Sequence, residues 1–149
     1  MDDILIYMDC CCLCRPYDDI TQNKTYIEGL VILTLLSECV YGPWKLVGSD
    51  ILEYEIAKIS DIIKKNAVLV LYETKTENIK INETIIKRAN EIQKYGIKLI
   101  DSLHFASAEY KKVNVLLTFD KDFIKASKRV DSLLMVQSPI NWFTEEFKK

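Results

Sequence analysis

Short apolar runs alternate with longer helical patterns, and this alternation limits the fold more than any other feature of the chain. The clearest runs are Ile4–Met8, Lys45–Val47 and Val113–Thr118, and the last is apolar almost throughout. A nearly continuous apolar run is typical of a central strand that is covered on both faces. Strands that alternate with helices indicate an α/β fold, in which a mainly parallel sheet lies between layers of helices.

The remaining elements follow from apolar periodicity and from residues that end helices. Two further strands are expected over Lys75–Ile81 and Leu133–Val136. Helices are expected over Thr25–Cys39, from Ser49 or Asp50 through Lys65, from Asn82 to Tyr95, over Asp101–Lys112, after Asp122 and from Pro139. Ala67–Tyr72 suits a strand or a buried helix, and Arg15–Lys24 is expected to be a loop. Without a repeat or a linker, residues 1–149 are expected to form one domain.

Composition excludes several classes of protein. The chain is 49% hydrophobic and 28% charged, and its five Phe, eight Tyr and two Trp are too many for a disordered protein. No stretch approaches the roughly 18–20 apolar residues of a transmembrane helix. Met1 is followed by Asp2 and Asp3, where a secretory leader carries positive charge, so a cytoplasmic location is expected.

The net charge of −2 conceals an asymmetry between the two parts of the chain. Residues 1–60 hold ten acids and four bases (−6), and residues 61–149 hold twelve acids and sixteen bases (+4). A neutral total is therefore compatible with an acidic site beside a basic surface, and it predicts weak, salt-sensitive binding of nucleic acid. The bases expected to guide a phosphate backbone, unless they belong to ordinary solvated helix faces, are Lys87, Arg88, Lys94, Lys111, Lys112, Lys121, Lys125, Lys128 and Arg129.

Four of the five cysteines lie close together, at Cys10, Cys11, Cys12 and Cys14, and Cys39 stands apart. Adjacent cysteines make a poor disulfide framework, and an odd number leaves one thiol free. The C-x-x-C spacing of Cys11 and Cys14 is compatible with zinc or with a redox dithiol, although a second pair of zinc ligands is missing. The favoured interpretation is a tight strand-to-loop turn in which cysteine acts as a small hydrophobic residue.

Two acidic residues follow predicted strands directly. Asp9 ends the first apolar run, and Asp120 comes after Val113–Thr118. Because ligands of parallel α/β sheets bind outside the carboxyl ends of the strands, both side chains are expected at the same edge. Asp120 also suits a helix cap, a role for which Asp122 competes.

Two more acids lie in helices that are otherwise apolar. Asp101 is either a functional acid or an N-cap beside a hydrophobic staple of Ile100 and Phe105. At about 100° per residue, Glu55 falls inside the apolar stripe of its helix, which comprises Ile51, Leu52, Ile56, Ile59, Ile62 and Ile63. Glu28 is either a fifth acid of the site or a partner for Arg15.

Inward carboxylates without inward bases repel one another, so their pKa values rise or a cation binds among them. A ligand set of carboxylate oxygens selects Mg²⁺ or Mn²⁺. Such a site supports the attack of metal-activated water on a phosphodiester.

Four segments in this order resemble the PIN domain, and in particular its VapC-like ribonucleases, which are the toxins of toxin–antitoxin pairs. The segments are Ile6–Cys11, Ser49–Glu55, Ile100–Ala106 and Thr118–Phe123, and Arg15–Asp19 resembles a segment of one subgroup. The resemblance implies a three-layer α/β fold in which Asp9, Glu55, Asp101 and Asp120 gather around Mg²⁺ or Mn²⁺. The family usually carries small hydroxyl or amide residues where this chain has Cys10 and Cys11, and thiols donate hydrogen bonds poorly.

The leading hypothesis is therefore a metal-dependent endoribonuclease with an RNA substrate. In this hypothesis Asp9, Asp101 and Asp120 bind the ion, and Glu55 binds it or orients the attacking water. The alternative is a catalytically idle PIN fold that acts in protein interaction. A phosphatase of the haloacid-dehalogenase type would need a second Asp where Cys11 stands, and a thioredoxin-like enzyme would use Cys11 with Cys14.

The helix expected over Thr25–Cys39 is too apolar for a single buried stripe. An exposed apolar face of this kind marks an interaction surface. We therefore expect a homodimer interface on this helix, or a partner that covers it, such as an antitoxin peptide.

Overall fold

Five parallel strands form one sheet in the spatial order β3-β2-β1-β4-β5. The structure is a computed structural model that describes residues 3–147. The strands are β1 (Ile4–Met8), β2 (Trp44–Ser49), β3 (Glu77–Ile79), β4 (Val115–Leu117) and β5 (Val136–Gln137). The predicted α/β fold with a parallel sheet between helices is confirmed.

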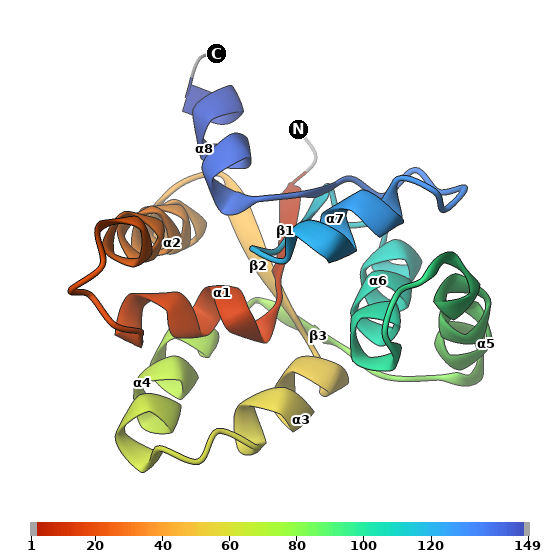
Figure 1. Ribbon diagram of the computed structural model, residues 1–149, viewed down its shortest axis with the longest axis horizontal. Helices are drawn as coiled ribbons and strands as arrows, with labels where there is room; N and C mark the ends of the chain where they lie inside the picture. Colours follow the sequence, from red (N-terminus) through yellow and green to blue (C-terminus); the bar gives the residue numbers. More distant parts are fainter. Residues whose placement is uncertain (1–2, 148–149) are drawn as a thin grey trace.

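Helices cover both faces of the sheet. They are α1 (Cys10–Cys14), α2 (Asn23–Tyr41), α3 (Asp50–Ala57), α4 (Ile62–Tyr72), α5 (Glu83–Ile92), α6 (Leu99–Lys111), α7 (Lys121–Ser127) and α8 (Pro139–Phe147), with 3-10 helices η1 (Arg15–Tyr17) and η2 (Gln93–Tyr95). In Figure 1 the sheet runs through the middle, with α2 and α4 on its left and α5 and α6 on its right. None of the helices within residues 3–147 has the length and apolarity needed to cross a membrane. Met1 and Asp2, on which the expectation about a leader rests, lie outside the described residues.

The order of the strands reverses between β1 and β4. From β1 the chain moves to β2 and then to β3, and it returns to the other side of β1 to form β4 and β5. The loops that follow β1 and β4 therefore diverge, and in open parallel sheets this divergence creates the crevice in which ligands bind. Met8 pairs with Leu117 across the two strands, and the Asp9 amide donates to the Leu117 carbonyl at 3.2 Å. The divergence thus begins at Asp9.

The two strands that bound this crevice are also the most deeply buried. Ile6, Tyr7 and Met8 of β1 are fully buried, as are all three residues of β4. Burial on both faces explains why these strands were predictable from apolar runs alone. Rigid backbone therefore lies directly beneath both strand ends.

The predicted helix from Ser49 or Asp50 through Lys65 is wrong, because α3 ends at Ala57 and α4 begins at Ile62. The Asp61 side chain caps α4 by accepting hydrogen bonds from the amides of Ile63 and Lys64. Ile62 and Ile63 do not belong to the apolar stripe of α3, since they are 63% and 80% exposed. The ambiguous segment Ala67–Tyr72 is the second half of α4.

Four other local predictions differ from the structure. The cysteines after β1 form the short helix α1, and η1 and the start of α2 occupy part of the predicted loop Arg15–Lys24. Helix α6 begins at Leu99, two residues before Asp101. The last strand is Val136–Gln137, not Leu133–Val136, because only Val136 and Gln137 pair with β4 while Leu133 is fully exposed.

Candidate active site

Asp9 and Asp120 lie at the carboxyl edge of the sheet and both cap helices. Asp9 begins α1 and accepts a hydrogen bond from the Cys12 amide at 3.1 Å. Asp120 begins α7, and its Oδ1 accepts from the amides of Asp122 and Phe123 at 2.9 and 3.1 Å. The prediction that Asp120 suits a helix cap is confirmed, and Asp122 is not the cap. Capping fixes both side chains relative to the ends of β1 and β4.

The hydroxyl of Thr118 connects these two acids. Thr118 is fully buried, and its Oγ1 accepts a hydrogen bond from the Asp120 amide at 3.1 Å. The same hydroxyl is among the groups that lower the pKa of Asp9, so it lies near that carboxylate. One hydroxyl at the end of β4 thus lies close to both acids.

Asp101 and Glu55 reach the same region from two helices. Asp101 lies in the first turn of α6, whose N-cap is Lys98, so the interpretation of Asp101 as an N-cap is wrong. Burial is the largest cause that raises the pKa of Asp101, His104 opposes the shift, and the carboxylates of Asp9, Asp120 and Glu55 contribute to a pKa of about 6. Because charge interactions of this kind weaken with distance, the other three predicted acids lie in the same region as Asp101.

Asp9 is the most buried member of this cluster, at 5% exposed. Burial raises the pKa of Asp9, while hydrogen bonds from Thr118 and Cys12 and the nearby His104 lower it. Desolvation therefore outweighs the hydrogen bonds at this position. Both shifted acids gain a proton more readily than free aspartate, as expected for carboxylates that burial has desolvated.

A chain of hydrogen bonds leads from the interior to Glu55. His104, which is fully buried, contacts the Glu55 carboxylate through Nε2 and the Tyr7 hydroxyl through Nδ1, the latter at 2.5 Å. The Tyr7 hydroxyl lies 2.7 Å from Ser49 Oγ, which accepts from the Leu52 amide at 3.1 Å. Every atom of the chain has a partner when His104 donates from Nε2 and accepts at Nδ1. Each donor then points toward Glu55.

This network includes residues that the sequence analysis did not assign to the site. His104 is one helical turn after Asp101, so the two side chains share a face of α6. That spacing was the available signal, together with a lone histidine in an apolar helix. The contact with Glu55 joins α6 to α3 across 49 positions of sequence, and periodicity within one helix does not predict such a contact.

The remaining candidate residues are Glu28, Asp122 and the cysteines. Glu28 is buried and lies 3.6 Å from Arg15 Nε, so it is the partner of Arg15 and not a fifth acid of the cluster. Asp122 is exposed. Cys10 and Cys14 face each other at 3.9 Å within α1, and all five cysteines are free. Cys10, Cys11 and Cys14 line a cavity of about 350 Å³ that also contacts Glu55.

Carboxylate oxygens suit a hard divalent cation by their chemistry. Within residues 3–147, no three His, Cys, Asp or Glu side chains stand close enough together to hold an ion as they are placed. The zinc interpretation of Cys11 and Cys14 therefore gains no ligand set. The four carboxylates lie in one region but do not form a ligand shell. A cation bound among them would relieve the repulsion between their charges. The donor set fits Mg²⁺ or Mn²⁺ in chemistry and in charge.

Two solved structures with the same fold are VapBC toxin–antitoxin complexes. VapBC2 from Rickettsia felis, bound to a DNA fragment from its promoter, aligns over 89% of this chain and 98% of its own with a TM-score of 0.56 and 17% identity. VapBC-1 from nontypeable Haemophilus influenzae aligns over 91% and 98% with a TM-score of 0.57 and 18% identity. At these identities the likeness concerns the fold. Among curated proteins, none matches the sequence.

The family model of the PIN domain matches residues 21–129. Glu55, Asp101 and Asp120 lie inside the matched region, and Asp9 lies before it. Membership excludes the haloacid-dehalogenase and thioredoxin-like folds that the sequence left open. Since the match covers well over half of the 149 residues, the chain belongs to the PIN domain family.

Proposed function

We propose that this protein is a Mg²⁺- or Mn²⁺-dependent endoribonuclease of the VapC type. The observation that carries the proposal is the gathering of four carboxylates, from four separate segments, at the crevice where the strand order reverses. Membership of the PIN family and the toxin–antitoxin complexes among proteins of the same fold support the reaction class.

Each acid has a distinct place in the proposed mechanism. Asp9, Asp101 and Asp120 would hold the ion, and Glu55 would either hold it or orient the attacking water. A bound divalent ion lowers the pKa of water and stabilises the leaving oxygen of the phosphodiester. His104 and Tyr7 hold the Glu55 carboxylate in one orientation, because rotation of that carboxylate would break a buried hydrogen bond.

The thiols at Cys10 and Cys11 do not leave the surroundings of Asp9 without a hydroxyl. Thr118, at the end of β4, is among the groups that lower the pKa of Asp9. A hydroxyl near the first acid supports the nuclease over the alternative of a catalytically idle PIN fold.

The test compares Asp101→Asn with Asp122→Asn on single-stranded RNA. Asp101→Asn is expected to lower Mg²⁺-dependent cleavage by about 100-fold or more, as is usual for loss of an electrostatic group in the site. Asp122→Asn makes the same chemical change at an exposed position in α7 and is expected to cleave normally. Cleavage retained by Asp101→Asn would overturn the assignment.

Calorimetric titration with Mn²⁺ separates the nuclease from the idle fold. The nuclease is expected to bind Mn²⁺ at micromolar to millimolar concentration, and Asp101→Asn is expected to bind it more weakly. A wild-type protein that binds no Mn²⁺ would favour the idle fold and a role in protein interaction.

We propose an antitoxin as the protein partner, seated on the outer face of α2. Four apolar side chains of this face are exposed, namely Tyr26, Ile27, Leu30 and Leu33 at 48%, 53%, 46% and 41%. An apolar cavity of about 190 Å³ lies between them and η1. Exposed apolar area beside a cavity suits an amphipathic segment. The test is co-expression with any short reading frame that adjoins the gene: wild type is expected to co-purify with its product, and Leu30→Lys is not.

A further inference from the structure

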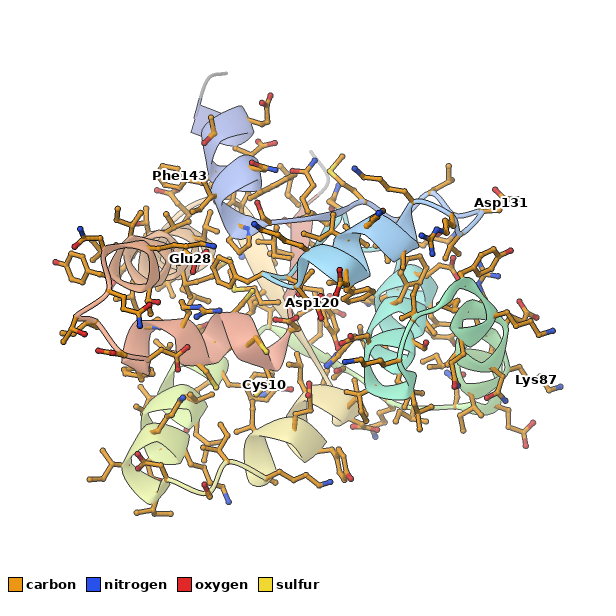
Figure 2. All side chains as sticks on the ribbon, in the orientation of Figure 1. Cys10, Glu28, Lys87, Asp120, Asp131 and Phe143 are labelled. Atoms are coloured by element: carbon orange, nitrogen blue, oxygen red, sulfur yellow. The ribbon has the colours of Figure 1, made fainter. Side chains whose placement is uncertain are left out.

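A groove lined by lysines opens beside Asp120, between α2, α7 and the start of α8. Its cavity measures about 470 Å³. Lys24 of α2 and Lys121, Lys125 and Lys128 at α7 line it, over a floor that includes Phe119. We call these four lysines and their cavity the lysine groove. Figure 2 labels Glu28 on the α2 side of the groove and Asp120 at its α7 end.

The charges of the lysine groove are not compensated. None of its four lysines makes an ion pair with the residues that the structure describes, and all four are exposed. The acid that lines the groove, Glu28, is already paired with Arg15 at 3.6 Å. The groove therefore presents four positive charges that attract an anion.

Ion pairs remove two other bases from the predicted set of phosphate-binding residues. Arg88 is bound by Glu91 and Glu109, at 3.0 and 2.7 Å, and Lys111 lies 2.6 Å from Glu77. Lys121, Lys125 and Lys128 belong to the predicted set and have no such partner. Lys24 was missed because it comes from the acidic first part of the chain.

The lysines of α7 form a row that starts at the acidic cluster. Positions 121, 125 and 128 follow the i, i+4, i+7 spacing, so they share one face of the helix. At 1.5 Å per residue the row is about 10 Å long, which matches roughly three nucleotides of a stacked strand at about 3.4 Å each. Phe119 and Lys121 flank Asp120 directly in sequence and both line the groove. The groove therefore begins at the residues on either side of one of the acids.

We propose that the lysine groove binds the phosphate backbone of single-stranded RNA next to the nucleotide that the acidic cluster cleaves. This inference rests on the proposed function and adds the path of the substrate. The regular row of lysines favours a polyanion with evenly spaced charges over an acidic peptide, and binding would be electrostatic and independent of sequence.

The test measures RNA binding by Lys125→Glu/Lys128→Glu in the Asp101→Asn background, in EDTA, so that cleavage does not interfere. Fluorescence anisotropy follows a short fluorescein-labelled single-stranded RNA. Reversal of both charges is expected to raise Kd by about ten-fold or more, and the log–log salt slope is expected to fall by about 1.4, or about 0.7 per phosphate contact. Lys125→Arg/Lys128→Arg is expected to bind as tightly as the parent.

The control is Lys87→Glu/Lys94→Glu, which makes the same change of net charge on exposed positions of α5 and η2. Figure 2 shows Lys87 on the opposite side of the molecule from Glu28. This control is expected to change Kd by less than about two-fold. Equal losses of RNA affinity in the two charge-reversed double variants would contradict the proposed role of the lysine groove, since the effect would then reflect only total charge.

Two further outcomes would contradict the proposed role of the lysine groove. The first is RNA binding that Lys125→Glu/Lys128→Glu leaves unchanged. The second is that this variant loses antitoxin co-purification but keeps RNA binding, because the groove would then bind an acidic peptide. Cleavage by the wild-type protein in the same buffer with Mg²⁺ tests the proposed function separately. A wild type that cleaves RNA, with groove variants that bind it normally, rejects the groove and leaves the nuclease in place.

Discussion

Buried hydrogen-bonding side chains surround two of the four acids. Thr118 lies near Asp9, and the chain of Ser49, Tyr7 and His104 orients Glu55. Buried hydrogen-bonded groups of this kind restrict the rotamers of the side chains that they contact. The carboxylates therefore keep a defined arrangement in the absence of a bound cation.

Replacing Tyr7 by Phe tests the hydrogen-bond chain. The change removes one hydroxyl and leaves two buried atoms, His104 Nδ1 and Ser49 Oγ, each with one partner fewer. We expect the free energy of unfolding to fall by about 1–3 kcal/mol, measured by urea denaturation. Tyr110→Phe, at a 55% exposed position, is the control and is expected to stay within about 0.5 kcal/mol of wild type. Equal effects would mean that the hydroxyl of Tyr7 has no special role.

Asp101 is expected to destabilise the metal-free protein when it is ionised. Since its pKa is raised to about 6 in the folded state, the neutral form favours folding, and this contribution is lost as the pH rises through about 6. In EDTA at pH 8, Asp101→Asn is therefore expected to raise the free energy of unfolding by about 1 kcal/mol, a figure reduced for solvent screening.

Thermal denaturation between pH 4 and pH 8 measures the difference in stability between Asp101→Asn and wild type. This difference is expected to vanish near pH 4. With Mn²⁺ present the order is expected to reverse, because wild type binds the ion and the variant has lost one ligand. A constant difference across this pH range would show that the gain does not come from the charge of Asp101.

At the scale of elements, the predictable strands and helices are those with a single environment along their length. β1 and β4 are buried throughout, and α5 has Asn82 as its N-cap, which accepts from the Ile85 amide, and Gly96 in the left-handed conformation after η2. The break between α3 and α4 was missed because the apolar pattern continues through Ile62 and Ile63, which are exposed. Apolar periodicity does not distinguish a core face from an exposed apolar face.

Asp61 is what separates α4 from α3. Its side chain accepts two amide hydrogen bonds, at 3.0 and 3.2 Å, in the first turn of α4. Asp61→Ala is expected to lower the free energy of unfolding by about 1 kcal/mol, measured by urea denaturation. Ser60→Ala, at the exposed position before it, is the control and is expected to have little effect. A similar loss for both would mean that the cap does not stabilise the helix.

At the scale of the molecule, the fold and the edge of the sheet that carries the acids follow from the order of strands and the positions of Asp9 and Asp120. The contacts that assemble the site do not, because they join segments that are far apart in sequence. The fold alone brings His104 to Glu55 and Thr118 close to Asp9. The same holds for the lysine groove, where Lys24 joins three lysines that follow it by about a hundred residues.

The apolar face of α2 leads to a prediction about self-association. Without a partner, the exposed side chains of this face are expected to pair with a second copy at high concentration, giving a mass near twice 17.3 kDa in multi-angle light scattering. Leu30→Lys is expected to restore the monomer, whereas Leu133→Lys, at a fully exposed position, is not. A wild type that stays monomeric would contradict this prediction.

The double role of Asp9 and Asp120 has an evolutionary consequence. Each side chain begins a helix as well as belonging to the acidic cluster, and asparagine caps helices about as well as aspartate. A lineage under selection to lose the activity would therefore keep its fold most easily by changing these two residues to asparagine. Glu55 and Asp101 begin no helix. Inactive descendants are thus expected to be restricted in sequence at Asp9 and Asp120 and diverse at Glu55 and Asp101.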